Sequence, residues 1–208
     1  MTKTEKADRA EPQRRKGPAR REAFMNAALT RFARQGFAAT STRQICTDLD
    51  IAHSAIYNYF PTKESILLAI GEREMTVMQA ELDAVVSLAA DRSARDRLQQ
   101  AVHKVVLQAM DRREAWRLLV DMLPALAPRN RAIMIDHRDR FEATIRDLLR
   151  QAVEAGEVEA GNQDLTIFNL LGMADGIARW YRPNGPMSKE TIADNTTAFF
   201  MRALRTAE

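Results

Sequence analysis

The chain has little cysteine and histidine, and this scarcity excludes several kinds of site. Cys46 is the single cysteine among 208 residues, so no intramolecular disulfide can form, and a reducing cytoplasm fits the chain. The three histidines, His53, His103 and His137, do not have the spacing of metal ligands, and we expect neither a metal nor a cofactor. Cys46 falls in an expected helix, where a small buried residue is favoured over a redox sensor.

Long apolar runs and β-type alternation are also missing. No stretch approaches the roughly 20 apolar residues that a membrane helix needs, and the charged first twenty residues do not resemble a signal peptide. Hydrophobic residues make up 46% and charged residues 28% of the chain, which is ordinary for a globular protein. We therefore predict an all-α, cytoplasmic protein that does not contact a membrane.

Features of a catalytic site are scarce as well. His137-Arg138-Asp139 matches a kinase catalytic triplet, but it falls within an expected helix and has no glycine-rich loop upstream, so we interpret the match as a coincidence. No pocket with paired acid and base groups can be read from the chain. We predict that the protein is not an enzyme.

Positive charge is concentrated near the amino terminus. Residues 1–63 hold 12 Lys and Arg against 6 Asp and Glu, whereas residues 64–208 hold 19 against 22. The net charge of +3 thus combines a basic first part, +6, with a weakly acidic remainder, −3. Such an asymmetry is typical of a protein that contacts nucleic acid through one part only. A basic tail without a partner is the plainer alternative.

The pattern of apolar residues predicts three regions and about nine helices. Residues 1–18 are basic and nearly free of large apolar side chains, so we expect a disordered arm. Residues 19–65 form a DNA-binding domain with a helix-turn-helix over 41–60, and residues 66–208 form an effector-binding and dimerisation domain. The remaining helices are expected at about 20–34, 63–88, 93–111, 112–126, 129–155, 163–182 and 188–206.

Residues 41–60 are the most informative segment. Gly36 is expected to end the helix before it, because glycine adopts the left-handed cap without steric cost. Thr42 is expected to cap the second helix, which buries Ile45 and Leu49. The third helix carries no acid and presents hydroxyls, an amide and an imidazole, which suit phosphates and base edges in a DNA groove.

This part of the chain resembles the TetR family of transcriptional regulators. Ala27–Phe37 resembles the first helix and glycine stop of the family, Ala39–Ile45 resembles the entry to the second helix, and Ile56–Glu64 resembles the recognition helix and the start of the linking helix. The resemblance covers roughly residues 20–70. It implies DNA contacts at the following positions: Thr42, Arg43, His53, Ser54, Tyr57, Asn58, Tyr59 and Lys63.

Some of these positions have alternative interpretations. Tyr57 and Tyr59 could pack the small three-helix core, and Lys63 could be a solvated lysine. The chain also departs from the family at two positions, because Asp50 stands where the family often has glycine and Ala52 stands where it often has a Ser or Thr cap. Loss of that cap costs the third helix roughly 1 kcal/mol.

The second half of the chain predicts a ligand pocket and a dimer contact. Methionine, aromatic and arginine side chains suit a pocket for an apolar effector with an anionic head: Met110, Trp116, Met122, Met134, Phe141, Phe168, Met173, Arg179 and Arg182. The resemblance implies that the last two helices form the dimer interface, with these candidates: Gly172, Gly176, Phe199, Phe200 and Leu204. Ordinary core packing is the alternative for each of them.

The segment Asp175–Gly185 is similar to a subgroup of TetR regulators that control fatty-acid or steroid breakdown, some of which respond to acyl-CoA thioesters. The resemblance thus implies a homodimeric repressor that binds palindromic, double-stranded operator DNA and responds to a small hydrophobic effector, with an acyl-CoA as one candidate. A helical scaffold whose basic arm binds acidic partners non-specifically is the alternative.

Overall fold

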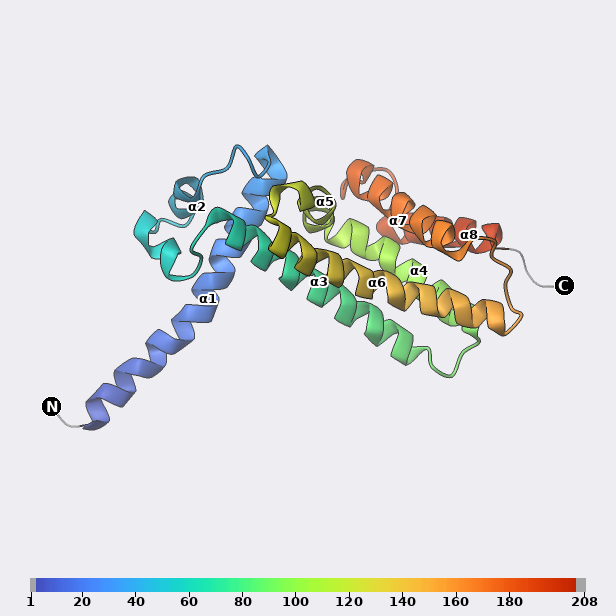
Figure 1. The fold of residues 1–208 in the computed structure, drawn as a ribbon, viewed down its shortest axis with the longest axis horizontal. Coiled ribbons are helices and arrows are strands. Elements are labelled where there is room, and N and C mark those ends of the chain that lie inside the picture. The colour runs from blue at the N-terminus through green and yellow to red at the C-terminus, as the bar shows by residue number, and fades with distance from the viewer. Residues whose placement is uncertain (1–2, 205–208) are drawn as a thin grey trace. The chain divides into compact units, whose positions relative to one another are not determined.

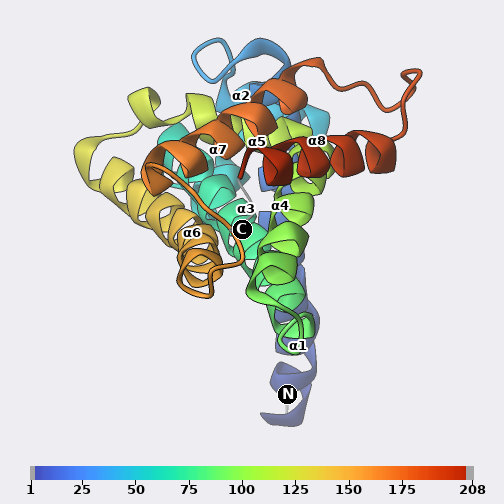
Figure 2. The same cartoon turned by 90° about the vertical axis from the view of Figure 1, so that its right-hand side faces the viewer.

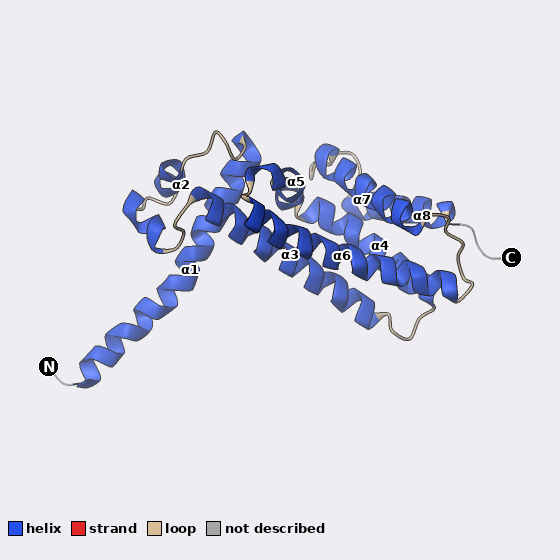
Figure 3. Cartoon of the chain, in the orientation of Figure 1, coloured by secondary structure: helices blue, strands red, loops and turns tan. Residues whose placement is uncertain are grey.

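The computed structural model describes the backbone of residues 3–204 and the side chains of residues 17–204. Within this range the chain consists of eight α-helices and two short 3-10 helices, without a β-strand (Figure 3). The prediction of an all-α fold is confirmed. The chain divides into two compact units at Ile70 and Gly71, five residues beyond the boundary expected from the sequence.

The first unit contains α1 (Lys3–Gln35), α2 (Thr42–Asp48), the 3-10 helix η1 (His53–Asn58) and the beginning of α3 (Lys63–Leu88), as Figure 1 shows. Helix α1 begins at Lys3, whereas the sequence predicted a disordered arm over residues 1–18 and a helix from about residue 20. The arm is rich in Ala, Glu, Lys, Arg and Gln, which have high intrinsic helix propensity. Residues 1 and 2 lie outside the described residues.

Apolar side chains at helical spacing hold the first unit together. Phe24, Ala28 and Phe32 of α1 are buried, as are Ile45 of α2 and Ile56 of η1. Helix α1 ends at Gly36, which adopts φ +83° and donates its amide to the Phe32 carbonyl at 2.9 Å. The predicted glycine stop is therefore confirmed, because few other residues adopt this backbone conformation without strain.

Ser41, not Thr42, caps α2. The Ser41 hydroxyl accepts the Gln44 amide at 3.2 Å, and the Gln44 side-chain oxygen accepts the Ser41 amide at 2.8 Å. This reciprocal pair is a capping box, which satisfies two amides that the helix leaves without intrahelical partners. The prediction of Thr42 as the cap is wrong, since Thr42 is the first helical residue and its hydroxyl is left for other partners.

The second unit is a bundle in which α4 (Ala94–Asp111) packs against α6 (Pro128–Glu154), α7 (Gln163–Trp180) and α8 (Lys189–Ala203). Figure 2 shows α8 crossing α4. Helix α5 (Arg113–Asp121) packs against α7, and the 3-10 helix η2 (Leu123–Ala125) leads into α6. Buried leucine, valine and isoleucine side chains form the core of this unit, among them Leu98 and Val105 of α4, Ile145 of α6, and Ile167 and Ile177 of α7.

A buried ionic network joins α3 and α4 within this unit. Glu74 is 5% exposed and pairs with Arg73 at 2.6 Å and with Arg112 at 3.1 Å. Arg112 also pairs with Glu81 at 2.6 Å, and Lys104 pairs with Glu81 at 2.9 Å. Burial acts to raise the pKa of Glu81, but hydrogen bonds from Lys104, Arg112 and Gln108 outweigh it and lower the pKa to about 2.

Candidate functional site

Three polar side chains of the first unit meet at the start of α2. The Thr42 hydroxyl lies 2.9 Å from His53 Nε2, and the Tyr57 hydroxyl lies 3.4 Å from both of these atoms. The imidazole and phenol rings meet edge to face, with centroids 5.3 Å apart. Thr42 is free for this contact because Ser41 takes the capping role. We call Thr42, His53 and Tyr57 the polar triad.

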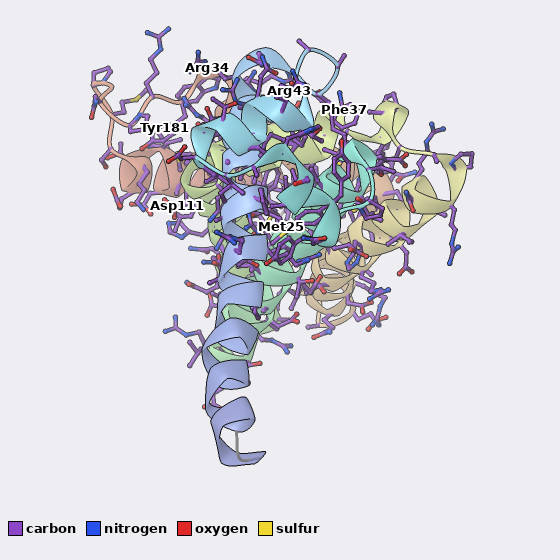
Figure 4. All side chains as sticks on the ribbon, turned by 90° about the vertical axis from the view of Figure 1, so that its left-hand side faces the viewer. Met25, Arg34, Phe37, Arg43, Asp111 and Tyr181 are labelled. Atoms are coloured by element: carbon purple, nitrogen blue, oxygen red, sulfur yellow. The ribbon has the colours of Figure 1, made fainter. Side chains whose placement is uncertain are left out.

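The polar triad lies on an accessible surface. Tyr57 is 49% exposed although it is a large aromatic residue, and its neighbours Ser54 and Asn58 are exposed too. Arg43, which follows Thr42 on α2, is also exposed (Figure 4). The alternative that Tyr57 packs the core does not fit this exposure. Six of the eight predicted DNA-contact positions thus lie on α2 and η1, two elements that pack against each other.

Tyr59 has a different environment. Its ring packs against Phe24 of α1 with centroids 5.6 Å apart, and the side chain is only partly exposed. The core-packing alternative therefore describes the Tyr59 ring better than a role in DNA contact.

Lys63 uses its ammonium group within the first unit. Its Nζ donates to the carbonyls of Phe37 at 2.8 Å, Thr40 at 2.9 Å and Ala38 at 3.4 Å, and it lies 4.3 Å from the centroid of the Phe37 ring. An ammonium group has three N–H donors, and here each has a carbonyl partner. Lys63 therefore ties the start of α3 to the connection between α1 and α2, which disfavours the predicted phosphate contact.

The expected third helix is a 3-10 helix of six residues. The residue that precedes it, Ala52, stands at the N-cap position and makes no side-chain capping bond, and the turn before it holds Asp50 at φ +51°. Bonds from the Ala55 amide to the Ala52 carbonyl and from the Tyr59 amide to the Ile56 carbonyl span three residues instead of four. The tight winding follows from the absent cap and the short length, both of which weaken an α-helix.

The second unit contains a cavity of about 120 Å³ between α3, α5, α6 and α7. Apolar side chains make up most of its wall, and three charged side chains complete it: Met75, Met78, Trp116, Leu119, Val120, Arg138, Phe141, Glu142, Leu171 and Asp175. A largely apolar cavity with a few polar groups is typical of a site for a small molecule.

Two of the predicted ligand residues, Trp116 and Phe141, line this cavity. Met110 is instead buried in a cluster with Val106 and Ile177. Met122 and Met134 pack around Gly71, where an added Cβ would lie 2.8–3.0 Å from their side-chain atoms. These three methionines are core residues of the second unit, and the close approach also accounts for the glycine.

The remaining predicted ligand residues lie outside the cavity wall. Arg179 pairs with Asp175 at 3.2 Å and with Asp121 at 3.5 Å, and Arg182 is exposed. Met173 is partly buried. The sequence did not identify Arg138, Glu142 or Asp175 as wall residues, because helical spacing alone does not show which neighbouring helix faces them.

Helix α7 carries an exposed apolar face. Phe168 is 54% exposed, and Leu165 and Gly172 lie on the same face at helical spacing. An added Cβ at Gly172 or Gly176 would meet nothing within 4 Å. Phe168 was predicted to line the ligand pocket, but its exposure suits a contact with another chain. We call Leu165, Phe168 and Gly172 the α7 face.

The candidates on α8 divide into two kinds. Phe199 is 60% exposed and remains a candidate for a dimer contact. Phe200 and Leu204 are buried within the second unit, so their own chain already covers them. The prediction that they form the dimer interface does not fit this burial, because a single apolar face of α8 cannot pack inward and outward at once.

None of the described helices combines the length and the apolar character of a membrane span. No group of three or more His, Cys, Asp or Glu side chains in the described part of the chain could hold a metal ion.

Two family models match the chain. Residues 24–70 match the model described as bacterial regulatory proteins, tetR family, and residues 91–204 match the model described as tetracyclin repressor-like, C-terminal domain. The first match contains the polar triad, and the second contains most of the cavity wall and the whole α7 face.

Individual proteins are similar over most of their length. The HTH-type transcriptional repressor KstR2 of Mycobacterium tuberculosis strain H37Rv is 23% identical over 185 residues, which cover 88% of this chain and 91% of the relative. A regulatory protein of the tetR family from Rhodococcus RHA1 has a crystal structure with a TM-score of 0.82 and 26% identity, covering 90% of this chain and 98% of that one. AibR in complex with isovaleryl coenzyme A and operator DNA has a TM-score of 0.77 and 20% identity, covering 86% and 97%.

Proposed function

The chain belongs to the TetR family of bacterial regulatory proteins, and we propose that it is a dimeric repressor that a small hydrophobic effector releases from palindromic operator DNA. The observation that carries this proposal is the polar triad on α2 and η1, in which Tyr57 is exposed and Thr42 and His53 are partly exposed. The family consists of regulators, and the proposed function requires no catalytic chemistry. Binding to the cell's DNA places the protein in the cytoplasm.

The polar triad suits a DNA groove. Hydroxyl groups of Thr42 and Tyr57 can donate to phosphate oxygens, and exposed Asn58 can form two hydrogen bonds to a base edge. The contacts within the triad hold the Tyr57 ring in one orientation before DNA binds. A side chain that is already ordered loses less conformational entropy on binding.

Pairing of two chains supplies the second half of the DNA site. A single helix-turn-helix unit buries too little surface for tight specific binding, so two units on a two-fold symmetric site are expected. The α7 face and Phe199 of α8 are the exposed apolar surfaces that a second copy would cover.

The cavity of the second unit is the proposed effector site. The relatives include a structure described as a ketosteroid transcriptional regulator, KstR2, and AibR with isovaleryl coenzyme A, and both suggest an apolar ligand. An acyl-CoA is thus one candidate effector. Arg138 lines the cavity and is partly exposed, so it is better placed for an anionic head group than Arg179 or Arg182.

DNA binding is tested with two threonines of the same helix. Thr42→Ala removes a triad hydroxyl, whereas Thr47→Ala removes a hydroxyl that bonds to the Arg43 carbonyl of its own helix. Fluorescence anisotropy with duplex DNA from the region upstream of the gene should show at least tenfold weaker binding for Thr42→Ala and Tyr57→Ala, and nearly unchanged binding for Thr47→Ala. A difference of tenfold corresponds to about 1.4 kcal/mol.

The dependence of DNA binding on salt concentration distinguishes the proposed repressor from the alternative, a helical scaffold whose basic arm binds acidic partners. Binding that retains its sequence preference at moderate salt supports the repressor, while binding that shows no preference and vanishes with salt supports a scaffold with a basic arm. Unchanged affinity of both Thr42→Ala and Tyr57→Ala would remove the polar triad from the DNA-binding surface.

The proposed dimer contact is tested by a substitution that places a negative charge on the α7 face. Phe168→Glu should convert the dimer to a monomer in analytical ultracentrifugation, with helical content unchanged in circular dichroism. Ile135→Glu is the matched control, because Ile135 is also an exposed apolar residue but lies on α6. A Phe168→Glu protein that remains dimeric would refute the proposed interface.

A further inference from the structure

Two polar atoms of the cavity wall lack a partner. Trp116 is 6% exposed, and its indole Nε1 is buried without a hydrogen-bond partner in the described part of the chain. The same holds for Oδ1 of Asp175, whose other oxygen accepts from Arg179 Nε at 3.2 Å. Both residues line the cavity, and the helices that carry them, α5 and α7, pack against each other. Buried polar groups in folded proteins nearly always have partners, so this pair requires an explanation.

The two atoms have opposite hydrogen-bonding character. An indole N–H can only donate, and a carboxylate oxygen can only accept. The other oxygen of Asp175 is occupied by the Arg179 guanidinium, which lies outside the cavity wall. A group that satisfies both atoms must therefore accept from Trp116 and donate to Asp175, as a neutral hydroxyl group does.

The charges around the cavity exclude an anion from its interior. Asp175 and Glu142 both contribute carboxylates to the wall. Glu142 is paired with Arg138 at 3.5 Å and with Arg146 at 3.9 Å, and the side chains of these arginines are 45% and 34% exposed, so their charge is partly directed to solvent. A ligand carboxylate placed beside Asp175 would face a like charge at low dielectric. The rest of the interior is apolar, with Met75, Phe141 and Leu171 among its residues.

We propose that the effector carries a neutral hydroxyl group on its apolar body, and that this group binds between Trp116 Nε1 and Asp175 Oδ1. The inference rests on the proposed effector site and specifies the chemistry of its ligand. The hydroxyl can belong to a free alicyclic molecule or to the acyl chain of a thioester, since the two atoms recognise the same group in both.

Matched ligand pairs test the preference. Isothermal titration calorimetry compares cyclohexanol with cyclohexanone, which can accept but not donate, and compares 3-hydroxybutyryl-CoA with butyryl-CoA. The hydroxylated member of at least one pair should bind about tenfold more tightly. A preference in the alicyclic pair alone indicates a free molecule, and a preference in the thioester pair indicates a hydroxyacyl group.

Matched protein variants assign the preference to the two residues. Trp116→Phe keeps an aromatic ring but removes the N–H. It should reduce the preference within the thioester pair to less than threefold, and it should weaken the binding of cyclohexanol and cyclohexanone alike, because both can accept from the indole. Trp180→Phe, which changes an exposed tryptophan outside the cavity wall, should retain the preference. Asp175→Ala should also abolish the preference, whereas Asp121→Ala removes the other partner of Arg179 and should leave the preference intact.

These titrations contain no DNA, so their outcome is independent of operator release. Three results would overturn the inference: equal affinities within both pairs, absence of binding by both hydroxylated probes, or a Trp116→Phe protein with native helical content that keeps the thioester preference and the native affinity for cyclohexanol. Operator release is measured separately by anisotropy. A hydroxyl preference without release would refute the proposed repressor mechanism while leaving the ligand assignment in place.

Discussion

Replacing Lys63 by methionine removes an ammonium group but keeps most of the apolar stem. Two of the hydrogen bonds that Nζ donates, to Phe37 and Thr40, are 2.8 and 2.9 Å long, and the bond to Ala38 is weaker at 3.4 Å. Hydrogen bonds to charged groups contribute about 1.5–3 kcal/mol when buried, and a partly exposed site retains roughly 1 kcal/mol for each of the two short bonds. The contact with the Phe37 ring adds about 0.5 kcal/mol.

We therefore expect Lys63→Met to lower the free energy of unfolding of the first unit by about 2–3 kcal/mol. Urea denaturation followed by circular dichroism measures the loss, and hydrogen exchange of peptides from residues 36–60 locates it. Lys63→Arg should not restore stability fully, because a planar guanidinium cannot direct its donors to three carbonyls around one point.

The same variant distinguishes this role from a phosphate contact. Each phosphate contact contributes about one unit to the slope of log affinity against log salt concentration. Lys63→Met should leave that slope unchanged in anisotropy titrations with duplex DNA, whereas Arg43→Gln, at an exposed position on α2, should reduce it by about one unit. A slope that falls by one unit in Lys63→Met, with an unchanged urea midpoint, would refute the reasoning.

Three further outcomes are expected. The pKa of Glu81 is lowered to about 2 from an ordinary value of 4.5. The stabilisation that the Glu81 carboxylate provides is therefore complete above about pH 4.5 and is lost as the pH falls toward 2. The urea midpoint should decline more over this range in the unmodified protein than in Glu81→Gln. Asp50→Gly should stabilise the first unit by about 0.5 kcal/mol in urea, because glycine adopts the φ of +51° without steric cost, and a destabilisation would contradict this. Ser41→Ala should cost about 1 kcal/mol by the same measurement, and a smaller loss than in Thr42→Ala would contradict the assigned cap.

Helical periodicity was sufficient to locate most elements. The helix predicted at 63–88 matches α3. The segment predicted at 93–111 differs from α4 by one residue at its start, and the segment predicted at 129–155 differs from α6 by one residue at each end. Long amphipathic segments between Pro and Gly breaks have one strongly preferred conformation, so local sequence determines them. The predicted 112–126 helix instead ends as α5 at Asp121 and is followed by η2, where Pro124 removes an amide donor.

The error at Thr42 was avoidable from sequence. Ser41 and Gln44 have the spacing of a capping box, in which a Ser or Thr is followed three residues later by Glu or Gln. Thr42 has Ile45 at that distance, and isoleucine cannot complete the reciprocal bond. The correct cap also changes the interpretation of function, because it leaves the Thr42 hydroxyl to join His53 and Tyr57.

Other assignments required three-dimensional information. Phe141 and Phe168 both lie in amphipathic helices, yet one lines the cavity and the other is exposed. Periodicity shows that a helix has an apolar face but does not show whether its own chain or a second chain covers it. Lys63 is a similar case, because its carbonyl partners lie more than twenty residues away in sequence.

Helix α7 connects the proposed effector site with the proposed dimer contact. Leu171 and Asp175 line the cavity, while Phe168 and Gly172 of the same helix are exposed. A ligand that binds Asp175 acts on the helix that also carries the proposed dimer contact, so a rotation of α7 would change both surfaces together. Allosteric coupling is reciprocal. Phe168→Glu, which separates the chains, should therefore change the affinity for 3-hydroxybutyryl-CoA or cyclohexanol in calorimetry, whereas Ile135→Glu should not; equal affinities in the two variants would show that the surfaces of α7 act independently.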